Sequence, residues 1–325
     1  MPDSAITVEG LQKRFGDVVA LDGIDFEVPP ATVFGLLGPN GAGKTTAVRT
    51  LTTIIRPDAG KATVLGLDVV EQAQRVRAHI GLAGQFAAVD GNLTGRENLR
   101  LIGRLSHLPR RLIEDRAAEL LAQFDLDDAA DRPVRTYSGG MRRRLDLCAA
   151  LVHRKTVLFL DEPTTGLDLY SRKQLWAVIE NLQSEGTTLL LTTQYLEEAD
   201  RLADDLVVID NGQVIAQGAP AHLKSRIGGT VIEVGFTDPG AARRAHGVFA
   251  KFACRPPEVN GSEVRFEVAD GARVLVDALR VLDGEGLAPE TIAVREPSLD
   301  DVFLALTGRR VEPEEPTEDS ERGAA

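Results

Sequence analysis

Short apolar runs separated by turn residues open the chain, and each has the length of a buried strand. They lie at residues 6–8, 20–21, 24–28 and 33–37. From residue 44 the apolar positions change to the period of a helix, which continues to residue 55 and stops before Pro57. The first part of the chain is therefore expected to be a group of strands that leads into one helix.

Residues 92–152 repeat apolar positions at helical spacing, which indicates a mainly helical segment. Thr94-Gly95-Arg96-Glu97 has the form of a capping box, in which Thr and Glu satisfy backbone N–H groups at the start of a helix. A second helix is predicted over residues 112–124. One face of a third helix carries Met141, Leu145, Cys148, Ala149 and Val152.

Strands and helices alternate after this helical segment. Apolar strands are predicted at residues 157–160 and 187–192, and helices at residues 171–185 and 196–203. Residues 206–218 form a predicted hairpin about Asn211-Gly212, a pair that favours the tight turn of a hairpin. Continuous apolar strands that alternate with helices favour a mostly parallel sheet covered on both faces.

The pattern changes again beyond about residue 225. Strands and helices are predicted in the order β-α-β-β-α-β, with a short helix after them, at residues 231–236, 241–252, 255–259, 263–268, 273–282, 291–294 and 298–306. This is the order of a small ferredoxin-like unit, and the alternative is an irregular extension packed on the first domain. We expect an α/β domain over residues 1–224, a small α+β domain over residues 225–308 and a disordered acidic tail over residues 309–325.

The composition excludes several classes of protein. Hydrophobic residues make up 43% of the 325 positions and charged residues 26%, which is typical of a globular protein. The net charge of −12 disfavours binding to a polyphosphate backbone, so nucleic acid is not an expected partner. Cys148 and Cys254 lie far apart, which fits a reducing compartment. No apolar run is long enough to cross a bilayer, and the N-terminus lacks the apolar stretch of a signal peptide, so we expect a cytoplasmic protein that meets a membrane only through a partner.

Residues 38–45 match the phosphate-binding pattern G-x-x-x-x-G-K-[ST] between an apolar strand and a helix. Glycines allow the backbone to curl so that its N–H groups face a phosphate, and the start of the helix adds a positive field. Lys44 is expected to reach the β- and γ-phosphates of a nucleotide, and Thr45 to bind Mg²⁺ through its hydroxyl. A glycine-rich turn with a chance lysine is the alternative, but it does not account for strand, motif and helix together. The residues of this P-loop are Gly38, Pro39, Asn40, Gly41, Ala42, Gly43, Lys44 and Thr45, and Thr46 follows.

The apolar strand at residues 157–160 is followed by two acids, Asp161 and Glu162. An Asp at the end of a strand in a P-loop sheet can hold the coordination shell of Mg²⁺. Glu162 beside it is placed to orient or polarise the attacking water. Two exposed acids at a strand end are the alternative, but the P-loop upstream favours the catalytic interpretation.

The sequence Tyr137-Ser138-Gly139-Gly140-Met141 precedes a predicted helix. Ser138 can cap this helix, and the glycines leave backbone N–H groups open to an anion. Three arginines at residues 142–144 follow in the first turn, where cations oppose the helix dipole. An anion nearby would explain them, although at least one of the three is expected to belong to a solvated basic face.

These motifs together resemble the nucleotide-binding subunit of an ABC transporter, and the resemblance covers residues 4–222 with every motif in order. It implies that the P-loop is the Walker A motif, that residues 157–162 are the Walker B motif, and that residues 137–141 are the signature sequence. The fold it implies is a P-loop ABC ATPase cassette. Such a cassette has an antiparallel β subdomain, a mostly parallel core sheet and a helical subdomain, here followed by the small α+β C-terminal domain.

The resemblance assigns further residues to the site. Gln85 matches the Q-loop, which implies that it contacts the Mg²⁺ bound also by Thr45 and Asp161. Asp168, in Thr165-Gly166-Leu167-Asp168, matches the D-loop. Phe15 stands where an aromatic ring stacks on the adenine of ATP, with a plain core phenylalanine as the alternative.

A narrower resemblance is to the daunorubicin/doxorubicin-resistance type of ATP-binding subunit. Its residues lie at 135–146, at 192–200 and in the terminal run Pro297-Ser298-Leu299-Asp300-Asp301-Val302-Phe303-Leu304. It implies a separate integral-membrane permease, export of a drug, antibiotic or lipid-like substrate, and a location at the cytoplasmic face of the cell membrane.

Three positions depart from the usual family pattern. The signature sequence has Tyr137 in place of Leu and Met141 in place of Gln, and the H-loop position is Gln194 in place of His. The amide of Gln194 can donate to a γ-phosphate oxygen but cannot become cationic. Glu162 is therefore the residue expected to activate water.

The resemblance also implies a mechanism that needs two subunits. ATP on the P-loop of one copy is closed by Ser138, Gly139 and Gly140 of a second copy, so that two ATP molecules are buried in a homodimer, and Gln85 transmits the change to the permease.

A soluble ABC ATPase acting in translation or DNA repair is the alternative. Such proteins carry a second cassette, coiled coils or zinc motifs, and the sequence contains none of these. A GTPase switch would need an Asn-Lys-x-Asp base reader, which the sequence also lacks.

Overall fold

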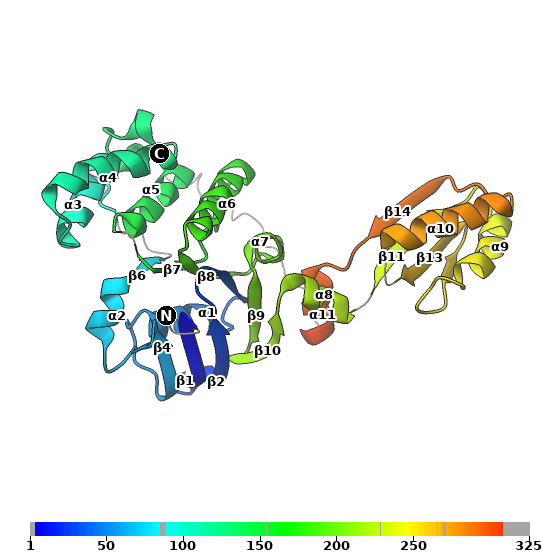
Figure 1. The fold of residues 1–325 in the computed structure, drawn as a ribbon, viewed down its shortest axis with the longest axis horizontal. Coiled ribbons are helices and arrows are strands. Elements are labelled where there is room, and N and C mark those ends of the chain that lie inside the picture. Colours follow the sequence, from blue (N-terminus) through cyan, green and yellow to red (C-terminus); the bar gives the residue numbers. More distant parts are fainter. Residues whose placement is uncertain (1–3, 85–88, 154, 228, 269–270, 308–325) are drawn as a thin grey trace, which may run out of the picture. The chain divides into compact units, whose positions relative to one another are not determined.

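A computed structural model describes residues 4–84, 89–153, 155–227, 229–268 and 271–307. The chain divides into two compact units, Met1–Pro220 and Ala221–Ala325, and each is described by itself (Figure 1). Gln85 and the acidic tail after residue 308 lie outside the described residues.

The first strands of the chain form an antiparallel sheet in the order β2-β1-β4-β5. Its members are β1 (Ile6–Phe15), β2 (Val18–Val28), β4 (Ala59–Val64) and β5 (Leu67–Asp68). The apolar runs predicted between residues 6 and 28 are parts of β1 and β2, which pair along their length. The sequence pattern does not predict β4, which approaches β1 so closely that a Cβ atom on Gly60 would lie 2.1 Å from the carbonyl oxygen of Gly10.

The core sheet contains six strands in the order β10-β9-β3-β8-β7-β6. They are β3 (Val33–Leu37), β6 (Ile80–Ala83), β7 (Val157–Asp161), β8 (Thr188–Thr193), β9 (Asp205–Asp210) and β10 (Gln213–Gly218). All neighbours are parallel except β9 and β10, which form the predicted hairpin. Asn211 and Gly212 at its turn have φ angles of 49° and 76°, the left-handed conformation that this turn requires. Every residue of β3, β7 and β8 is buried, as expected for strands covered on both faces.

Four helices accompany the two sheets of this unit (Figure 1). They are α1 (Lys44–Leu51), α2 (Ala73–His79), α6 (Leu169–Ser184) and α7 (Leu196–Leu202). Helix α1 ends four residues before the predicted position. The physical reason is Thr53, whose left-handed φ of 65° is incompatible with a continuing helix.

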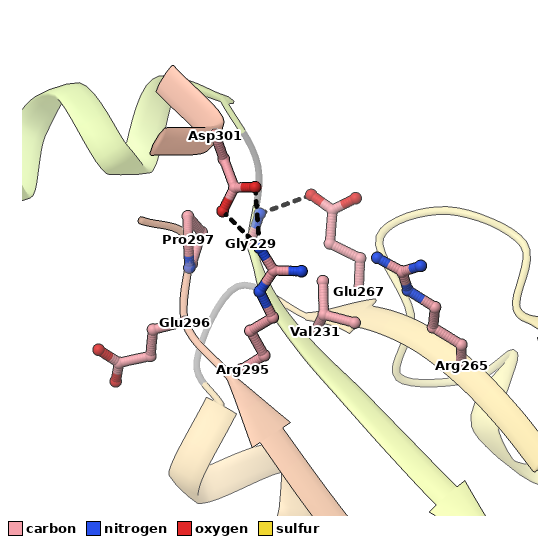
Figure 2. A pocket seen from close by; sticks show the side chains of 8 residues that line it. All are labelled: Gly229, Val231, Arg265, Glu267, Arg295, Glu296, Pro297 and Asp301. Carbon is pink, nitrogen blue, oxygen red and sulfur yellow. Dashed lines mark hydrogen bonds and ion pairs between the residues drawn. The ribbon is translucent and has the colours of Figure 1, made fainter. Parts of the chain in front are cut away.

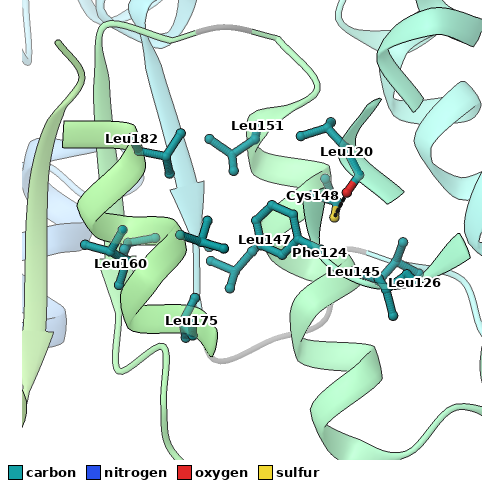
Figure 3. Packing of buried hydrophobic residues seen from close by; sticks show 14 of the residues in the cluster. Leu120, Phe124, Leu126, Leu145, Leu147, Cys148, Leu151, Leu160, Leu175 and Leu182 are labelled. Atoms are coloured by element: carbon teal, nitrogen blue, oxygen red, sulfur yellow. Dashed lines mark hydrogen bonds between the residues drawn. The ribbon is translucent and has the colours of Figure 1, made fainter. Parts of the chain in front are cut away.

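A helical segment comprises α3 (Gly95–Leu105), α4 (Arg110–Gln123) and α5 (Gly139–Leu151), with short 3₁₀ helices at Asp127–Ala129 and Val134–Thr136. The predicted capping box is confirmed, since Thr94 and Glu97 each accept the backbone N–H of the other. Figure 3 shows how this segment joins the core sheet: Phe124 of α4 and Leu147 and Leu151 of α5 share one apolar cluster with Leu160 of β7. This packing fixes α5 beside the end of β7.

The C-terminal unit begins with α8 (Pro220–Ile227) and ends with α11 (Leu299–Thr307). Between them lie β11 (Thr230–Gly235), α9 (Pro239–Phe249), β12 (Glu258–Asn260), β13 (Glu263–Val268), α10 (Gly271–Gly284) and β14 (Thr291–Arg295). The strands form an antiparallel sheet in the order β12-β13-β11-β14, so the ferredoxin-like order of elements is present. The predicted fold class, an α/β cassette followed by an α+β unit, is confirmed. Along the described parts of the chain, no helix has the length and apolar character that crossing a membrane requires.

Candidate active site

The P-loop joins the buried strand β3 to α1, as the sequence predicts. A Cβ atom on Gly38 would lie 2.2 Å from the carbonyl oxygen of Ile209, so only glycine fits between this loop and β9. Gly43 has a φ of 110°, and a Cβ atom there would lie 2.4 Å from the carbonyl oxygen of Ala20. The glycines of the motif therefore hold the start of α1 in a tight curve against β2 and β9.

Lys44, the first residue of α1, is almost completely buried, with 4% of its surface exposed. Its Nζ donates to the carbonyl oxygens of Gly38 at 2.8 Å and Pro39 at 3.0 Å, and lies 3.3 Å from Oε1 of Glu162. Burial lowers the pKa of Lys44, and the carboxylates of Glu162 and Asp161 oppose this shift. The lysine is thus folded back onto its own loop, where a bound phosphate would compete for the ammonium group.

Asp161 ends β7 and lies beside two hydroxyl groups. Thr192 of β8 donates to Oδ1 of Asp161 at 2.6 Å, and Thr45 of α1 donates to the same oxygen at 3.3 Å. Two of the predicted metal ligands, Thr45 and Asp161, are therefore in contact, and the third, Gln85, is outside the described residues. Among the residues described, no group of three or more His, Cys, Asp or Glu side chains could hold a metal ion. The oxygen atoms present suit Mg²⁺, which usually takes one or two carboxylates together with phosphate and water oxygens.

Glu162 follows β7 in a left-handed backbone conformation, with a φ of 49°. This conformation costs a residue other than glycine about 1–3 kcal/mol, so it persists only where neighbouring groups hold it. The N–H of Glu162 donates to the carbonyl oxygen of Thr192 at 3.2 Å and to its Oγ1 at 3.0 Å. The carbonyl oxygen of Glu162 accepts from Arg143 at 3.0 Å. With both backbone groups held, the carboxylate reaches the ammonium of Lys44 at the P-loop.

Glu162 and the P-loop line a single pocket together with the start of β2. The lining residues are Val18, Val19, Ala20, Asn40, Gly41, Gly43, Lys44, Thr45, Thr46 and Glu162. Phe15 pairs with Val18 across the β1–β2 turn, and 51% of its surface is exposed. The alternative that Phe15 is a plain core residue is therefore wrong. Its contact with adenine stays a prediction that this position beside the pocket favours.

Ser138 caps α5, as the sequence predicts, because its Oγ accepts the backbone N–H of Met141 at 3.2 Å. Ser138 and Gly139 are exposed, and a Cβ atom on Gly139 would meet nothing within 4 Å. Gly140 is more confined, since a Cβ atom there would lie 2.9 Å from Oγ of Ser171. These three residues, all described, are not among those that line the P-loop pocket. The structure therefore does not bring the two predicted phosphate-binding elements of one chain together.

Asp168 directly precedes α6 and lies close to the signature sequence. Its Oδ1 accepts the backbone N–H of Ser171 at 2.7 Å and so caps α6. This backbone hydrogen bond lowers the pKa of the Asp168 carboxyl. Because Ser171 is also the neighbour of Gly140, the structure brings the predicted D-loop and the signature sequence together.

Gln194 directly follows β8 and is buried, with 7% of its surface exposed. Its side chain is therefore inside the fold at the end of β8 and not a solvent-exposed bystander. The next residue is held in place, because the N–H of Tyr195 donates to Oγ1 of Thr193 at 2.9 Å. A contact between Gln194 and a γ-phosphate stays a prediction.

The sequence pattern does not single out Glu198 of α7, which is completely buried at 0% exposure. Its Oε1 accepts from the indole N–H of Trp176 at 3.2 Å. Burial raises the pKa of Glu198, and the hydrogen bond from Trp176 opposes the shift. The sequence signal that would have found it is an acidic residue four positions before Leu202, on the apolar face of a helix.

The three arginines of α5 differ in their surroundings. Arg142 is exposed, which matches the expectation that at least one of them is solvated. Arg144 donates to the carbonyl oxygen of Phe124 at 2.9 Å and to Oε1 of Gln174 at 3.2 Å, so it links α5 to α4 and α6. Arg143 turns instead toward the end of β7, where its partners are main-chain carbonyl oxygens. An anion is therefore not needed to explain Arg143 and Arg144.

A pocket in the C-terminal unit is lined by charged side chains that pair with one another (Figure 2). Arg295 donates to both carboxylate oxygens of Asp301, at 3.0 and 3.2 Å, and Glu267 accepts the backbone N–H of Gly229. Asp301 also accepts from the N–H and Oγ of Ser298, both at 2.9 Å. These contacts attach the start of α11 within this unit. The charged groups of this pocket are thus paired with one another, and the P-loop pocket is the candidate ligand site.

Comparison with known proteins gives matches along both units. The family model described as ABC transporter matches residues 21–165, and the one described as ATP-binding protein DrrA1-3-like, C-terminal domain, matches residues 218–307. The daunorubicin resistance ATP-binding protein DrrA2 of Streptomyces coeruleorubidus is 54% identical over 96% of this chain and 98% of its own. The Nod factor export ATP-binding protein I of Ralstonia nicotianae is 43% identical over 94% of each chain. The solved structure of cbiO1 from Clostridium perfringens, part of the ABC transporter complex cbiONQ, has a TM-score of 0.63 and 26% identity and covers 69% of this chain and 91% of its own.

Proposed function

The chain belongs to the ABC transporter ATP-binding subunits of the daunorubicin/doxorubicin-resistance type, and from this premise we propose how its nucleotide site is completed. As a member of this family the chain is an ATPase, and its hydrolysis of ATP powers an exporter. In our proposal, ATP binds to the P-loop of one copy and is closed by the signature helix α5 of a second copy. Two antiparallel copies then bury two ATP molecules, one in each shared site.

The observation that carries this proposal is the separation of two anion-binding elements within one chain. The P-loop pocket is lined by Lys44 and Glu162, whereas Ser138 and Gly139 at the start of α5 are exposed and lie outside it. An uncovered helix start with open backbone N–H groups suits an anion, and a phosphate presented by a second copy would supply one.

Each residue of the P-loop side has a role in this arrangement. Lys44 exchanges its loop carbonyl oxygens for the β- and γ-phosphates of ATP, and Phe15 stacks on the adenine. Oγ1 of Thr45 and Oδ1 of Asp161 are the oxygen atoms that would hold Mg²⁺, with Gln85 as a further ligand. Mg²⁺ would neutralise part of the charge on the transferred phosphoryl group.

Closure by the second copy positions the reacting groups and excludes water, which are the main contributions that phosphoryl transfer needs. The carboxylate of Glu162 accepts a proton from the attacking water, whose oxygen bonds to the γ-phosphorus while the bond to ADP breaks. Gln194, buried at the end of β8, donates its amide to a γ-phosphate oxygen. Loss of the γ-phosphate removes the link between the copies, and they separate.

The partner on the membrane side is a separate integral-membrane permease, which places this subunit at the cytoplasmic face of the cell membrane. The names of its relatives point to export of a drug, antibiotic or lipid-like molecule, and the permease forms the path for that molecule. Co-purification tests this part: when the chain is expressed with the permease encoded beside it, the two should form one detergent-stable complex. Recovery of the chain with ribosomes or DNA repair proteins instead would support the alternative function.

A mixture of two inactive variants tests the shared site. Lys44→Ala removes the P-loop ammonium and Ser138→Arg blocks the start of α5, so each variant alone should lack ATP hydrolysis. In a mixed dimer one site receives both lesions and the other receives neither. Since half of the dimers are mixed and one of their two sites is intact, trapping of a non-hydrolysable ATP analogue in dimers should return to about one quarter of the wild-type value, and this measurement does not depend on the placement of Glu162. A mixture that traps no more analogue than its components would contradict the two-copy site.

A further inference from the structure

Arg143 is the fifth residue of the signature helix α5 (Gly139–Leu151) and binds main-chain carbonyl oxygens on two separate segments. Its Nε donates to Pro163 at 2.9 Å, and its Nη2 donates to Asp161 at 3.2 Å and Glu162 at 3.0 Å. Its Nη1 donates to the carbonyl oxygen of Gly84, which follows β6. The guanidinium therefore spans the ends of two neighbouring strands of the core sheet, β7 and β6.

The two neighbouring arginines do not do this. Arg142 is exposed, and Arg144 points to the end of α4 and to α6. The contacts of Arg143 thus follow from its place on the helix rather than from a general basic character of this turn. They also need the planar fork of an arginine, because a lysine ammonium is a single point and cannot reach carbonyl groups on both segments.

The contact with Glu162 has a special consequence because this residue is left-handed, with a φ of 49°. Thr192 of β8 holds the N–H side of Glu162, and Arg143 of α5 holds its carbonyl side. The direction of the Glu162 carboxylate toward Lys44 therefore depends on two elements at once, one of which is the signature helix.

The same helix begins at Ser138, whose exposed end is the group expected to meet the ATP of the opposite copy. A short α-helix moves as one body, so a displacement of its start displaces Arg143 too. One of the carbonyl oxygens bound to Arg143 belongs to Glu162, which lines the P-loop pocket of its own copy.

We propose that Arg143 is a positioning residue that couples closure over one ATP to the placement of Glu162 at the other. The inference rests on the proposed function, since it needs two copies that share two sites. When α5 closes over the nucleotide of the opposite copy, Arg143 carries the carbonyl of Glu162 with it and brings the carboxylate to the attacking water in its own site. Without this link, the copies close but Glu162 is misplaced.

Arg143→Lys tests the coupling, with Arg142→Lys as the matched control on the same turn. Three quantities are measured for each full-length protein: binding of a fluorescent ATP analogue, dimer formation with a non-hydrolysable ATP analogue by size-exclusion chromatography with light scattering, and kcat for ATP. For Arg143→Lys, binding and dimer formation should stay within about twofold of wild type while kcat falls about 10-fold or more, because small misplacements of a reacting group have effects of this size. Arg142→Lys should match wild type in all three.

Two results would overturn the inference. One is a kcat for Arg143→Lys within about twofold of wild type. The other is a loss of nucleotide binding or dimer formation in proportion to kcat, which assigns Arg143 to stability alone. If Arg143→Lys unfolds below the assay temperature, Arg143→Gln is measured by the same criteria, and unfolding of both variants also assigns the residue to stability. A wild-type protein that forms no dimer with the analogue would instead refute the two-copy function, so the two failures are distinguishable.

Discussion

The P-loop side and the signature side of the nucleotide site differ in how their polar groups are paired. On the P-loop side, Lys44 is buried and bonded to its own loop and to Glu162, and Asp161 accepts from two threonine hydroxyls. On the signature side, Ser138 and Gly139 are exposed at the start of α5. The charged groups of the P-loop side are thus already paired within one chain, whereas the start of α5 is uncovered, as the proposed contact with a second copy requires.

This difference also separates the expected effects of substitution. A change on the P-loop side breaks a network that exists before ATP arrives, so it affects binding or chemistry within one copy. A change at the exposed start of α5, at Ser138 or Gly139, is expected to affect closure between the two copies of the proposed dimer.

Lys44→Ala should have the largest effect, because it removes the ammonium that is expected to face the phosphates and breaks the buried ion pair between Lys44 and Glu162. Nucleotide binding should weaken, and ATP hydrolysis should fall at least about 100-fold, the effect of removing one charge-stabilising donor. Lys61→Ala is the control, since it removes the same charge from an exposed position on β4. Steady-state hydrolysis and binding of a fluorescent ATP analogue are the measurements, and unchanged turnover would refute the role of the P-loop.

Glu162→Gln should affect chemistry but not capture of ATP. The amide has the shape of the carboxylate but cannot accept the proton of water, so hydrolysis should fall about 100-fold or more. ATP should then hold two copies together as a dimer that persists on size-exclusion chromatography. Glu185→Gln, at an exposed position after α6, should behave as wild type. Normal hydrolysis by Glu162→Gln would remove this residue from water activation.

Gln194 tests how far the closed network extends beyond the carboxylates. Gln194→Ala should lower kcat roughly 10-fold or more, equivalent to the loss of a hydrogen bond to a charged group of about 1.5–3 kcal/mol. Gln194→His should keep or raise activity and should add a titration near the ordinary His pKa of about 6.5, which wild type lacks at this position. The pH–rate profiles of the three proteins decide the question. An Ala variant that matches wild type at every pH would place Gln194 outside the site.

Glu198 should have the smallest effect, and on stability rather than on chemistry. Burial raises its pKa above that of the unfolded chain, so the folded state binds its proton more tightly and this contribution to stability falls as pH rises above the ordinary Glu range. Glu198→Gln cannot titrate, and its amide can still accept from Trp176. Its midpoint of thermal unfolding should therefore rise relative to that of wild type as the pH increases above the ordinary Glu range. Glu197→Gln, the exposed neighbour, should show no such gain, and an equal gain in both variants would refute the explanation by burial.

Much of the first unit could be predicted from the sequence, because its loops, caps and turns depend on interactions between residues that are close in the chain. The strand, glycine loop and helix around Lys44 follow from residues next to one another, and so do the capping box at Thr94 and the cap at Ser138. The hairpin about Asn211-Gly212 is of the same kind, since its turn needs two left-handed residues. The predicted roles of Phe15 and Gln194 depend in addition on how exposed their side chains are. No local sequence pattern gives that exposure.

The candidate phosphate-binding residues can be predicted from the sequence, because a P-loop, a strand ending in two acids and a glycine-rich helix start are contiguous motifs. Which of these elements meet in space depends on the tertiary structure. The pairing of β4 with β1, the ion pair of Lys44 with Glu162 and the position of Ser138 outside the P-loop pocket are all set by contacts between distant segments. The hydrogen bonds of Arg143 could not be predicted from the sequence. Their acceptors are main-chain carbonyl oxygens, which every residue has, so no residue type in the accepting segment indicates them.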